Sequence, residues 1–195
     1  LRPPGHHAMF DYAMGFCLFN NIAGAARVAQ SRFGIEHVAI ADFDVHHGNG
    51  TQWSFYQDSS VHYTSIHQYP FYPGTGASYE TGAGIGKGYT LNFPLSAGTD
   101  GKTALALFEP EFLAAMEMFR PNLVLISAGF DAHRDDPLAS LRFEDEDYRT
   151  ITNIICDVAD RYCDGKIVSV LEGGYDYEAL ARSAAEHVKG LLDVD

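Results

Sequence analysis

Short apolar runs that alternate with helix-like segments constrain the fold of this chain more than any other feature. A run of about five apolar residues bounded by polar ones is typical of a strand buried on both faces of a sheet. Such strands alternating with helices predict an α/β fold, with a mainly parallel central sheet in three α/β/α layers and right-handed crossovers. The expected strands are 38–43, 61–66, 89–93, 123–127 and 167–171, and the expected helices are 18–33, 103–119, 145–162 and 177–192.

The length of 195 residues and the hydrophobic content of 46% suit one core, so residues 1–195 are expected to form a single domain. The chain starts at Leu1, and no strand or helix precedes the segment 3–7, so we expect a partial, N-terminally truncated domain. No run reaches the roughly 18 apolar residues of a membrane helix, and no secretory signal pattern is present. A cytoplasmic location is expected, with the nucleus as an alternative in a eukaryote.

The net charge of −13 disfavours direct binding to nucleic acid, because that binding depends on clustered Lys and Arg. Cationic partners such as lysine-rich tails or polyamines fit better, although an acidic surface that only maintains solubility is the commoner reason for such a charge. The three cysteines have no C-x-x-C spacing, which disfavours a thiolate metal site. Neither charge nor cysteine content decides the function.

Polar, metal-capable side chains follow four of the expected strands. In an open parallel sheet the ligand site lies beyond the carboxyl ends of the strands, so these groups should share one edge. The segments concerned are 42–47, 65–67, 127–131 and 172–175. The sequence therefore predicts a polar site at this edge.

Alternation along an extended chain places Asp42, Asp44 and His46 on one side and Phe43 and Val45 on the other. Two carboxylates and an imidazole that converge in this way would repel or be costly to desolvate without a cation. A solvated acidic loop is the simpler alternative for this segment alone.

A third metal ligand is expected from the segment 131–137. Pro137 keeps Asp136 out of a helix, in an extended or turn conformation. A catalytic zinc ion usually takes three protein ligands and keeps one position open for water, and Asp44, His46 and Asp136 would supply the three. Alone, an Asp-Asp-Pro sequence is ordinary loop chemistry.

Two further short motifs carry groups that could act on a bound water. The adjacent His6 and His7 follow Pro-Pro-Gly, and neighbouring charge should lower the pKa of at least one of them. Gly173 and Gly174 permit close backbone approach and place Tyr175 at a strand end. Seen alone, the first is equally a surface histidine pair and the second a turn with a packed tyrosine.

Together these motifs resemble the zinc-dependent histone deacetylase family of the arginase-deacetylase fold. The resemblance runs through the whole chain in the family's order. It rests on Arg2-Pro3-Pro4-Gly5-His6-His7-Ala8, Gly15-Phe16-Cys17, Asp42-Phe43-Asp44-Val45-His46-His47-Gly48, Tyr72-Pro73-Gly74-Thr75-Gly76, Gly129-Phe130-Asp131 with Asp136-Pro137, and Glu172-Gly173-Gly174-Tyr175.

The resemblance implies a role for each matched position. Asp44, His46 and Asp136 correspond to the zinc ligands, with iron(II) as an alternative metal. His7 corresponds to the general base, His6 to its electrostatic partner oriented by Asp42, and Tyr175 to the phenol that binds the acetyl oxygen. The implied substrate tunnel comprises Gly15, Phe16, Cys17, Tyr72, Gly173 and Gly174. The implied site for a monovalent cation such as K⁺ comprises Asp42, Asp44, His46, Ser65 and Ile66.

Two positions refine the implied activity. Asn49 stands where class I members have an acid, so the chain is class II-like, and a neutral Asn49 should leave His7 less biased toward imidazolium. Leu138 stands where polyamine-preferring relatives can carry a glutamate, which favours acetyl-lysine over acetylpolyamine as the substrate.

Other functions are less well supported by the residues. A catalytically silent binding fragment is the alternative from another class, although the expected ligands are intact. The two-metal pattern of dimanganese ureohydrolases is absent, and Ser127 has no Gly-x-Ser-x-Gly elbow. The expected reaction is therefore metal-assisted hydrolysis of an acetylated amine.

Overall fold

A computed structural model describes residues 3–192, so Leu1 and Arg2, which begin the first motif, lie outside the described residues. The elements in chain order are α1 (Asn21–Phe33), β1 (Val38–Asp42), α2 (Asn49–Phe55), β2 (Val61–Gln68), the 3₁₀ turn η1 (Gly84–Gly86), β3 (Thr90–Leu95), α3 (Gly101–Phe119), β4 (Leu123–Ala128), α4 (Asp145–Tyr162), β5 (Ile167–Leu171) and α5 (Tyr177–Leu192). All nine expected strands and helices are present, with ends shifted by up to three residues.

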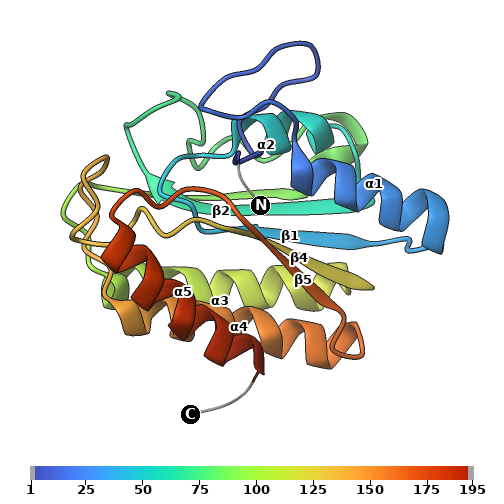
Figure 1. Cartoon of the computed structure of the whole chain (residues 1–195). Helices are drawn as coiled ribbons and strands as arrows, with labels where there is room; N and C mark the ends of the chain where they lie inside the picture. The colour runs from blue at the N-terminus through green and yellow to red at the C-terminus, as the bar shows by residue number, and fades with distance from the viewer. Residues whose placement is uncertain (1–2, 193–195) are drawn as a thin grey trace.

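The sheet is parallel throughout and has the strand order β3-β2-β1-β4-β5. Helices α1 and α2 cover one face, and α3, α4 and α5 cover the other, which gives the three expected layers (Figure 1). All five residues of β1 are buried, and their side chains alternate between the two faces: Val38 and Ile40 pack with α1, whereas Ala39 and Ala41 pack with α3 and α4. A strand buried on both faces explains why its sequence is apolar without interruption.

Local capping residues set the helix ends. Helix α1 begins three residues later than expected because the Asn20 side chain accepts a hydrogen bond from Ala23 N. It ends at Gly34, whose φ of 66° is the left-handed conformation favoured by glycine. Asp100 caps α3 in the same way through Thr103 N, and Glu144 and Asp147 form a capping box at α4.

The short helix α2 was not predicted from the sequence. Its buried side chains include Asn49, Thr51 and Gln52, so it lacks the apolar stripe by which an amphipathic helix is identified. These polar groups are instead used in internal hydrogen bonds, among them Gln52 with His47. Tertiary contacts therefore stabilise a helix that local pattern does not indicate.

The strand order creates a crevice between the carboxyl ends of β1 and β4. From β1 the chain proceeds outward through β2 to β3, then returns to β4 on the other side of β1. The carboxyl ends of β1 and β4, where Asp42 is paired with Ser127, are thus the topological switch point. Ligand sites of open parallel sheets form at such points.

Two buried histidines, His62 and His187, predict that acid destabilises the fold. Burial lowers the pKa of both His62 and His187 from 6.5 to about 4. Between these values the unfolded chain binds protons that the folded chain does not, so stability is fully present above pH 6.5 and falls as the pH drops toward 4. We expect a loss of about 1 to 2 kcal/mol per histidine between pH 7.5 and 5.0, measured by urea unfolding.

The variant His187→Gln isolates one of these contributions. His187 is bonded to two neutral hydroxyl groups, Thr152 Oγ1 through Nδ1 and Ser169 Oγ through Nε2, and neither offsets the cost of burying a positive charge. The variant should have a smaller difference in unfolding free energy between the two pH values than the unchanged protein. An equal difference would show that His187 does not contribute.

Candidate metal and catalytic site

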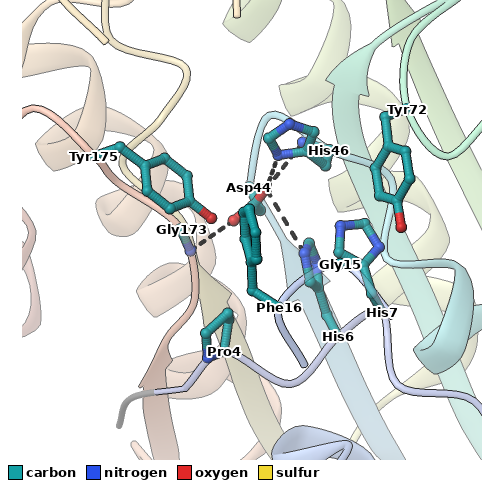
Figure 2. Close-up of a pocket in the computed structure, with 10 residues that line it drawn as sticks. All are labelled: Pro4, His6, His7, Gly15, Phe16, Asp44, His46, Tyr72, Gly173 and Tyr175. Carbon is teal, nitrogen blue, oxygen red and sulfur yellow. Dashed lines mark hydrogen bonds and ion pairs between the residues drawn. The ribbon is translucent and has the colours of Figure 1, made fainter. Parts of the chain in front are cut away.

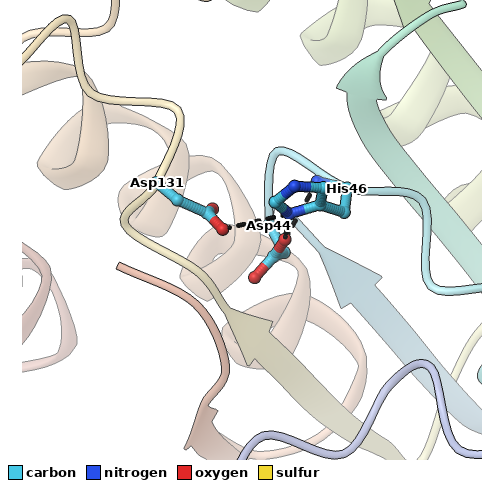
Figure 3. A group of neighbouring side chains, drawn as sticks. All are labelled: Asp44, His46 and Asp131. Carbon is cyan, nitrogen blue, oxygen red and sulfur yellow. Dashed lines mark hydrogen bonds and ion pairs between the residues drawn. The ribbon is translucent and has the colours of Figure 1, made fainter. Parts of the chain in front are cut away.

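Asp44, His46 and Asp131 meet at the switch point (Figure 3). Each offers one ligand atom, and these atoms lie within 4.8 Å of one another. His46 Nδ1 lies 3.1 Å from Asp44 Oδ1 and 3.2 Å from Asp131 Oδ2. Within residues 3–192 this is the group of three metal-capable side chains that the structure brings together.

The ends of β1 and β4 bring these side chains into place. Alternation after β1 puts Phe43 and Val45 into the core, as expected, and leaves Asp44 on the site face. Asp131 follows β4 and accepts a hydrogen bond from Val45 N at 2.9 Å through Oδ1. The two strand ends are therefore tied together by one of the site's own carboxylates.

The donor set fits a divalent cation. Asp131 Oδ2 is buried and, within residues 3–192, makes no hydrogen bond, although His46 Nδ1 lies 3.2 Å away as an ion-pair partner. Burial together with the charge of Asp44 raises the pKa of Asp131. The backbone approaches these carboxylates closely: a Cβ at Gly129 would lie 2.3 Å from Asp44 Oδ2, and a Cβ at Gly173 would lie 2.1 Å from Asp131 Oδ2, so a side chain at either position would clash with a carboxylate. Two carboxylates and one imidazole are ligands that zinc accepts.

Asp136, the expected third ligand, is not a member of this group. Its Oδ2 accepts hydrogen bonds from Tyr175 N at 2.7 Å and Asp176 N at 3.3 Å, and its Oδ1 accepts one from Leu138 N at 3.0 Å. Both oxygens are thus already bound to backbone amides. The expected set is corrected at this position: the structure places Asp131 with Asp44 and His46, and Asp136 under the turn that carries Tyr175.

The tandem histidines lie beside the metal-capable group. The two rings are 4.1 Å apart between centroids, and His7 and His46 are 5.9 Å apart. His6 Nδ1 lies 3.0 Å from Asp42 Oδ2, and His6 Nε2 lies 3.7 Å from Asp44 Oδ1. The predicted pairing of His6 with Asp42 is therefore present in the geometry.

Asn49 determines which nitrogen of His7 is protonated. His7 Nδ1 lies 2.7 Å from Asn49 Oδ1, while Asn49 Nδ2 lies 3.3 Å from the sulfur atoms of both Met9 and Met14. With its amide nitrogen facing the two thioethers, Asn49 presents an oxygen that can only accept. His7 Nδ1 therefore carries the proton, and Nε2 is left with a free electron pair.

The two neighbouring imidazoles have opposite proton affinities. Burial alone would lower the pKa of His6, but Asp42 and Asp44 outweigh it and raise that pKa well above 6.5. Burial and the charge of His6 lower the pKa of His7 to about 3. His7 is thus neutral at physiological pH, as a general base must be.

A pocket opens onto these groups from the protein surface (Figure 2). Its lining residues are Pro4, His6, His7, Gly15, Phe16, Asp44, His46, Tyr72, Gly173 and Tyr175. Tyr72 lies 5.2 Å from His7 and Phe16 lies 6.1 Å from Tyr175 between ring centroids. Figure 2 shows the Tyr175 hydroxyl turned toward the interior of the pocket.

Two expected tunnel residues lie behind this lining rather than in it. Cys17 is buried, and its thiol donates to Gly15 O at 3.2 Å. Gly174 has a φ of 127°, a conformation that permits the turn between Gly173 and Tyr175. For the expected monovalent-cation site, the structure shows that Asp42 and Ser65 are neighbours in the sheet, paired across β1 and β2, and that Ile66 follows Ser65. That these residues bind a cation stays a prediction.

Comparison with known proteins identifies the family. A sequence model of the histone deacetylase domain matches residues 1–191. The chain belongs to the histone deacetylase family. It is 45% identical over 192 residues to Histone deacetylase 10, chloroplastic, of Oryza sativa subsp. japonica, covering 98% of this chain and 43% of the relative.

Two other members of the histone deacetylase family show how far the likeness extends. A Histone deacetylase-like amidohydrolase of Pseudomonas aeruginosa is 43% identical, with 89% of this chain and 46% of the relative covered. The crystal structure of the HDA15 HD domain superposes with a TM-score of 0.94 at 45% identity, covering 100% of this chain and 54% of that one. The chain thus spans about half the length of these relatives.

Three site residues were not assigned by sequence reasoning. Asp131 stands closer to the end of β4 than Asp136 does, and this proximity was the signal available for choosing it. Phe71 stacks on His46 with 5.3 Å between centroids, and no local pattern separates it from its aromatic neighbours. Glu172 belongs to a recognised motif, but its partners are distant in sequence.

The two candidate third ligands can be separated by metal binding. Asp131→Asn removes a charged metal ligand. It should weaken zinc affinity by more than about 100-fold, whereas mutating a residue that only bonds to a ligand typically weakens it by roughly 10- to 100-fold. Asp136→Asn changes a residue bound to amides, and should weaken it less than about tenfold. Titration with a competing chelator measures both; the reverse order would restore Asp136 as the ligand.

Proposed function

We propose that this chain is the catalytic part of a zinc-dependent deacetylase that hydrolyses acetyl-lysine, with residues 1–195 forming one partial domain. The observation that carries the proposal is the group of Asp44, His46 and Asp131, two of whose members, Asp44 and His46, line the same pocket as His7 and Tyr175. A metal-capable centre, a neutral imidazole and a phenol are the groups that amide hydrolysis requires. The family membership supports the same reaction.

Asp44, His46 and Asp131 would hold the metal, with iron(II) as an alternative to zinc. Bound there, zinc would supply a Lewis acid for the acetyl carbonyl and lower the pKa of water to roughly 7. Gly173 N donates to Asp44 Oδ2 at 2.7 Å and fixes the orientation of that carboxylate. The ligands are thus held in place by backbone contacts.

His7 moves the proton. Its Nε2 takes a proton from water as the water oxygen bonds to the acetyl carbon, because Asn49 keeps the proton of Nδ1 in place. His7 then gives the proton to the lysine nitrogen as the carbon–nitrogen bond breaks, releasing the free amine and acetic acid, which loses its remaining proton to solvent as acetate. His6, held by Asp42, lies beside His7 and modulates its charge without touching the acetyl group.

Tyr175 stabilises the oxyanion that forms on the acetyl oxygen. A preorganised donor of this kind typically contributes about 3 to 4 kcal/mol to the transition state. Its backbone is fixed by the bond from Tyr175 N to Asp136. Asp136 would thus serve the site by holding the backbone of Tyr175 and not by binding the metal.

The walls of the pocket suit the aliphatic part of a lysine side chain. Phe16 and Tyr72 are exposed by 72% and 45% and flank the opening, so apolar methylenes can pack between them. Leu138 offers no charge for a second amine, which favours acetyl-lysine over an acetylated polyamine. Asn49 beside His7 supports a class II-like site.

Two further expectations accompany the proposed function. A monovalent cation such as K⁺ would be held by Asp42, Ser65, Ile66 and the backbone of Asp44 and His46. A cytoplasmic or nuclear location stays a prediction, and the names of two relatives specify the chloroplast. Within residues 3–192 no helix is long and apolar enough to cross a membrane.

Activity on an acetyl-lysine peptide tests the assigned roles. His7→Ala should lower kcat/KM by about 100-fold or more, because proton transfer is lost. Tyr175→Phe should lower kcat by about 100- to 1,000-fold, because an oxyanion donor is lost. The matched controls His37→Ala and Tyr177→Phe change exposed residues outside the pocket and should retain activity.

The same assay distinguishes the alternatives. Acetylputrescine should be a poorer substrate than the acetyl-lysine peptide, and a preference for it would identify a polyamine amidohydrolase. Chelation should abolish turnover and zinc should restore it. Unchanged turnover in His7→Ala and Tyr175→Phe would contradict the mechanism, and a metal-loaded protein inactive on both substrates would indicate a binding module.

A further inference from the structure

A buried carboxylate outside the proposed reaction, Glu172, connects the sheet to the tandem histidines. It follows β5 and has no exposed surface. Its Oε2 accepts hydrogen bonds from Gly5 N at 2.6 Å and His6 N at 3.1 Å, and its Oε1 accepts one from Ser127 Oγ at 3.0 Å. All three donors are neutral, so these bonds fix position without forming an ion pair.

The segment that Glu172 binds has no regular structure of its own. Residues 3–8 are held from the opposite side by α1 and α2: Thr51 N donates to His6 O at 3.1 Å, and a Cβ at Gly5 would lie 2.6 Å from Asn21 N. Those contacts fix the segment against the helices. Glu172 fixes it against the sheet edge where the metal-capable group lies.

The turn that follows Glu172 contacts the other parts of the site. Gly173 N donates to Asp44 Oδ2, and Tyr175 lies three residues after Glu172. One short segment therefore holds a proposed ligand, carries the proposed oxyanion donor and binds the backbone of His6. Displacement of the Glu172 carboxylate would change the position of His6 and His7 relative to Tyr175.

We propose that Glu172 is a positioning residue that sets the placement of the tandem histidines through the amides of Gly5 and His6. This inference rests on the proposed function, because the placement of the histidines matters only if His7 transfers the proton. Glu172 acts through geometry, and its negative charge is not the required property. The competing explanation is that the charge of Glu172 acts on His6, to which it contributes electrostatically.

Two substitutions separate geometry from charge. Glu172→Gln removes the charge but keeps an oxygen for the two amides, while its NH₂ group can donate to Ser127 Oγ. Glu172→Asp keeps the charge but is one methylene shorter, which withdraws the acceptor from Gly5 N and His6 N. Ser127→Ala is the matched control, because it removes one bond to Glu172 and leaves both amide bonds intact.

Two quantities are measured for each variant and for the unchanged protein. The first is turnover of the acetyl-lysine peptide by the zinc-loaded protein, and the second is amide hydrogen exchange of residues 4–9 by mass spectrometry. We expect Glu172→Asp to lower kcat at least tenfold with KM changed less than threefold, and to speed this exchange at least tenfold. Glu172→Gln and Ser127→Ala should remain within about threefold in both. Zinc content should stay at one per chain in all three.

The opposite pattern overturns the proposal. If Glu172→Gln is impaired and Glu172→Asp is not, the charge is what matters. If Glu172→Asp does not fold, a large loss in Glu172→Gln alone is sufficient to reject the proposal. If the unchanged protein has no deacetylase activity, the proposed function fails, while the exchange comparison still decides whether Glu172 holds the histidine segment.

Discussion

Three carboxylates buried at one edge of the sheet impose the constraint on which the site depends. Asp42, Asp44 and Asp131 are all at most 2% exposed, and burying charge is costly unless it is balanced. His6 balances Asp42, and His46 lies between Asp44 and Asp131, yet among the described residues one oxygen of Asp131 remains without a hydrogen bond. A cation at this point would complete the balance, and the strand order supplies the crevice in which it can sit.

The sequence was sufficient to predict the layers, the parallel sheet and the edge at which the site forms. Apolar runs, and polar groups at strand ends, are visible in short stretches of sequence, so these features can be predicted without knowing tertiary contacts. The third ligand could not be chosen this way, since Asp131 and Asp136 both follow β4 and only the folded chain shows that Asp136 is bound to Tyr175 N. Helix α2 was missed for a related reason: its buried polar residues are stabilised by distant partners.

The turn after β5 unites groups that are far apart in the sequence. Gly173 contacts Asp44 across 129 positions, and Glu172 contacts Gly5 across 167. Each of these bonds joins a backbone amide to a carboxylate oxygen of a buried side chain. The histidines, the metal-capable group and the phenol thus share the turn after β5 as a common support, and a change in this turn is expected to affect their placement before it affects metal content.

The most direct test of the account is an anomalous-scattering map, recorded at the zinc edge from crystals of the zinc-loaded protein. The account predicts one metal ion bound by Asp44, by His46 Nδ1 and by Asp131, with ligand distances of about 2.0 to 2.2 Å. A metal ion bound by Asp136 in place of Asp131, two adjacent ions, or no ion at the carboxyl ends of β1 and β4 would contradict it.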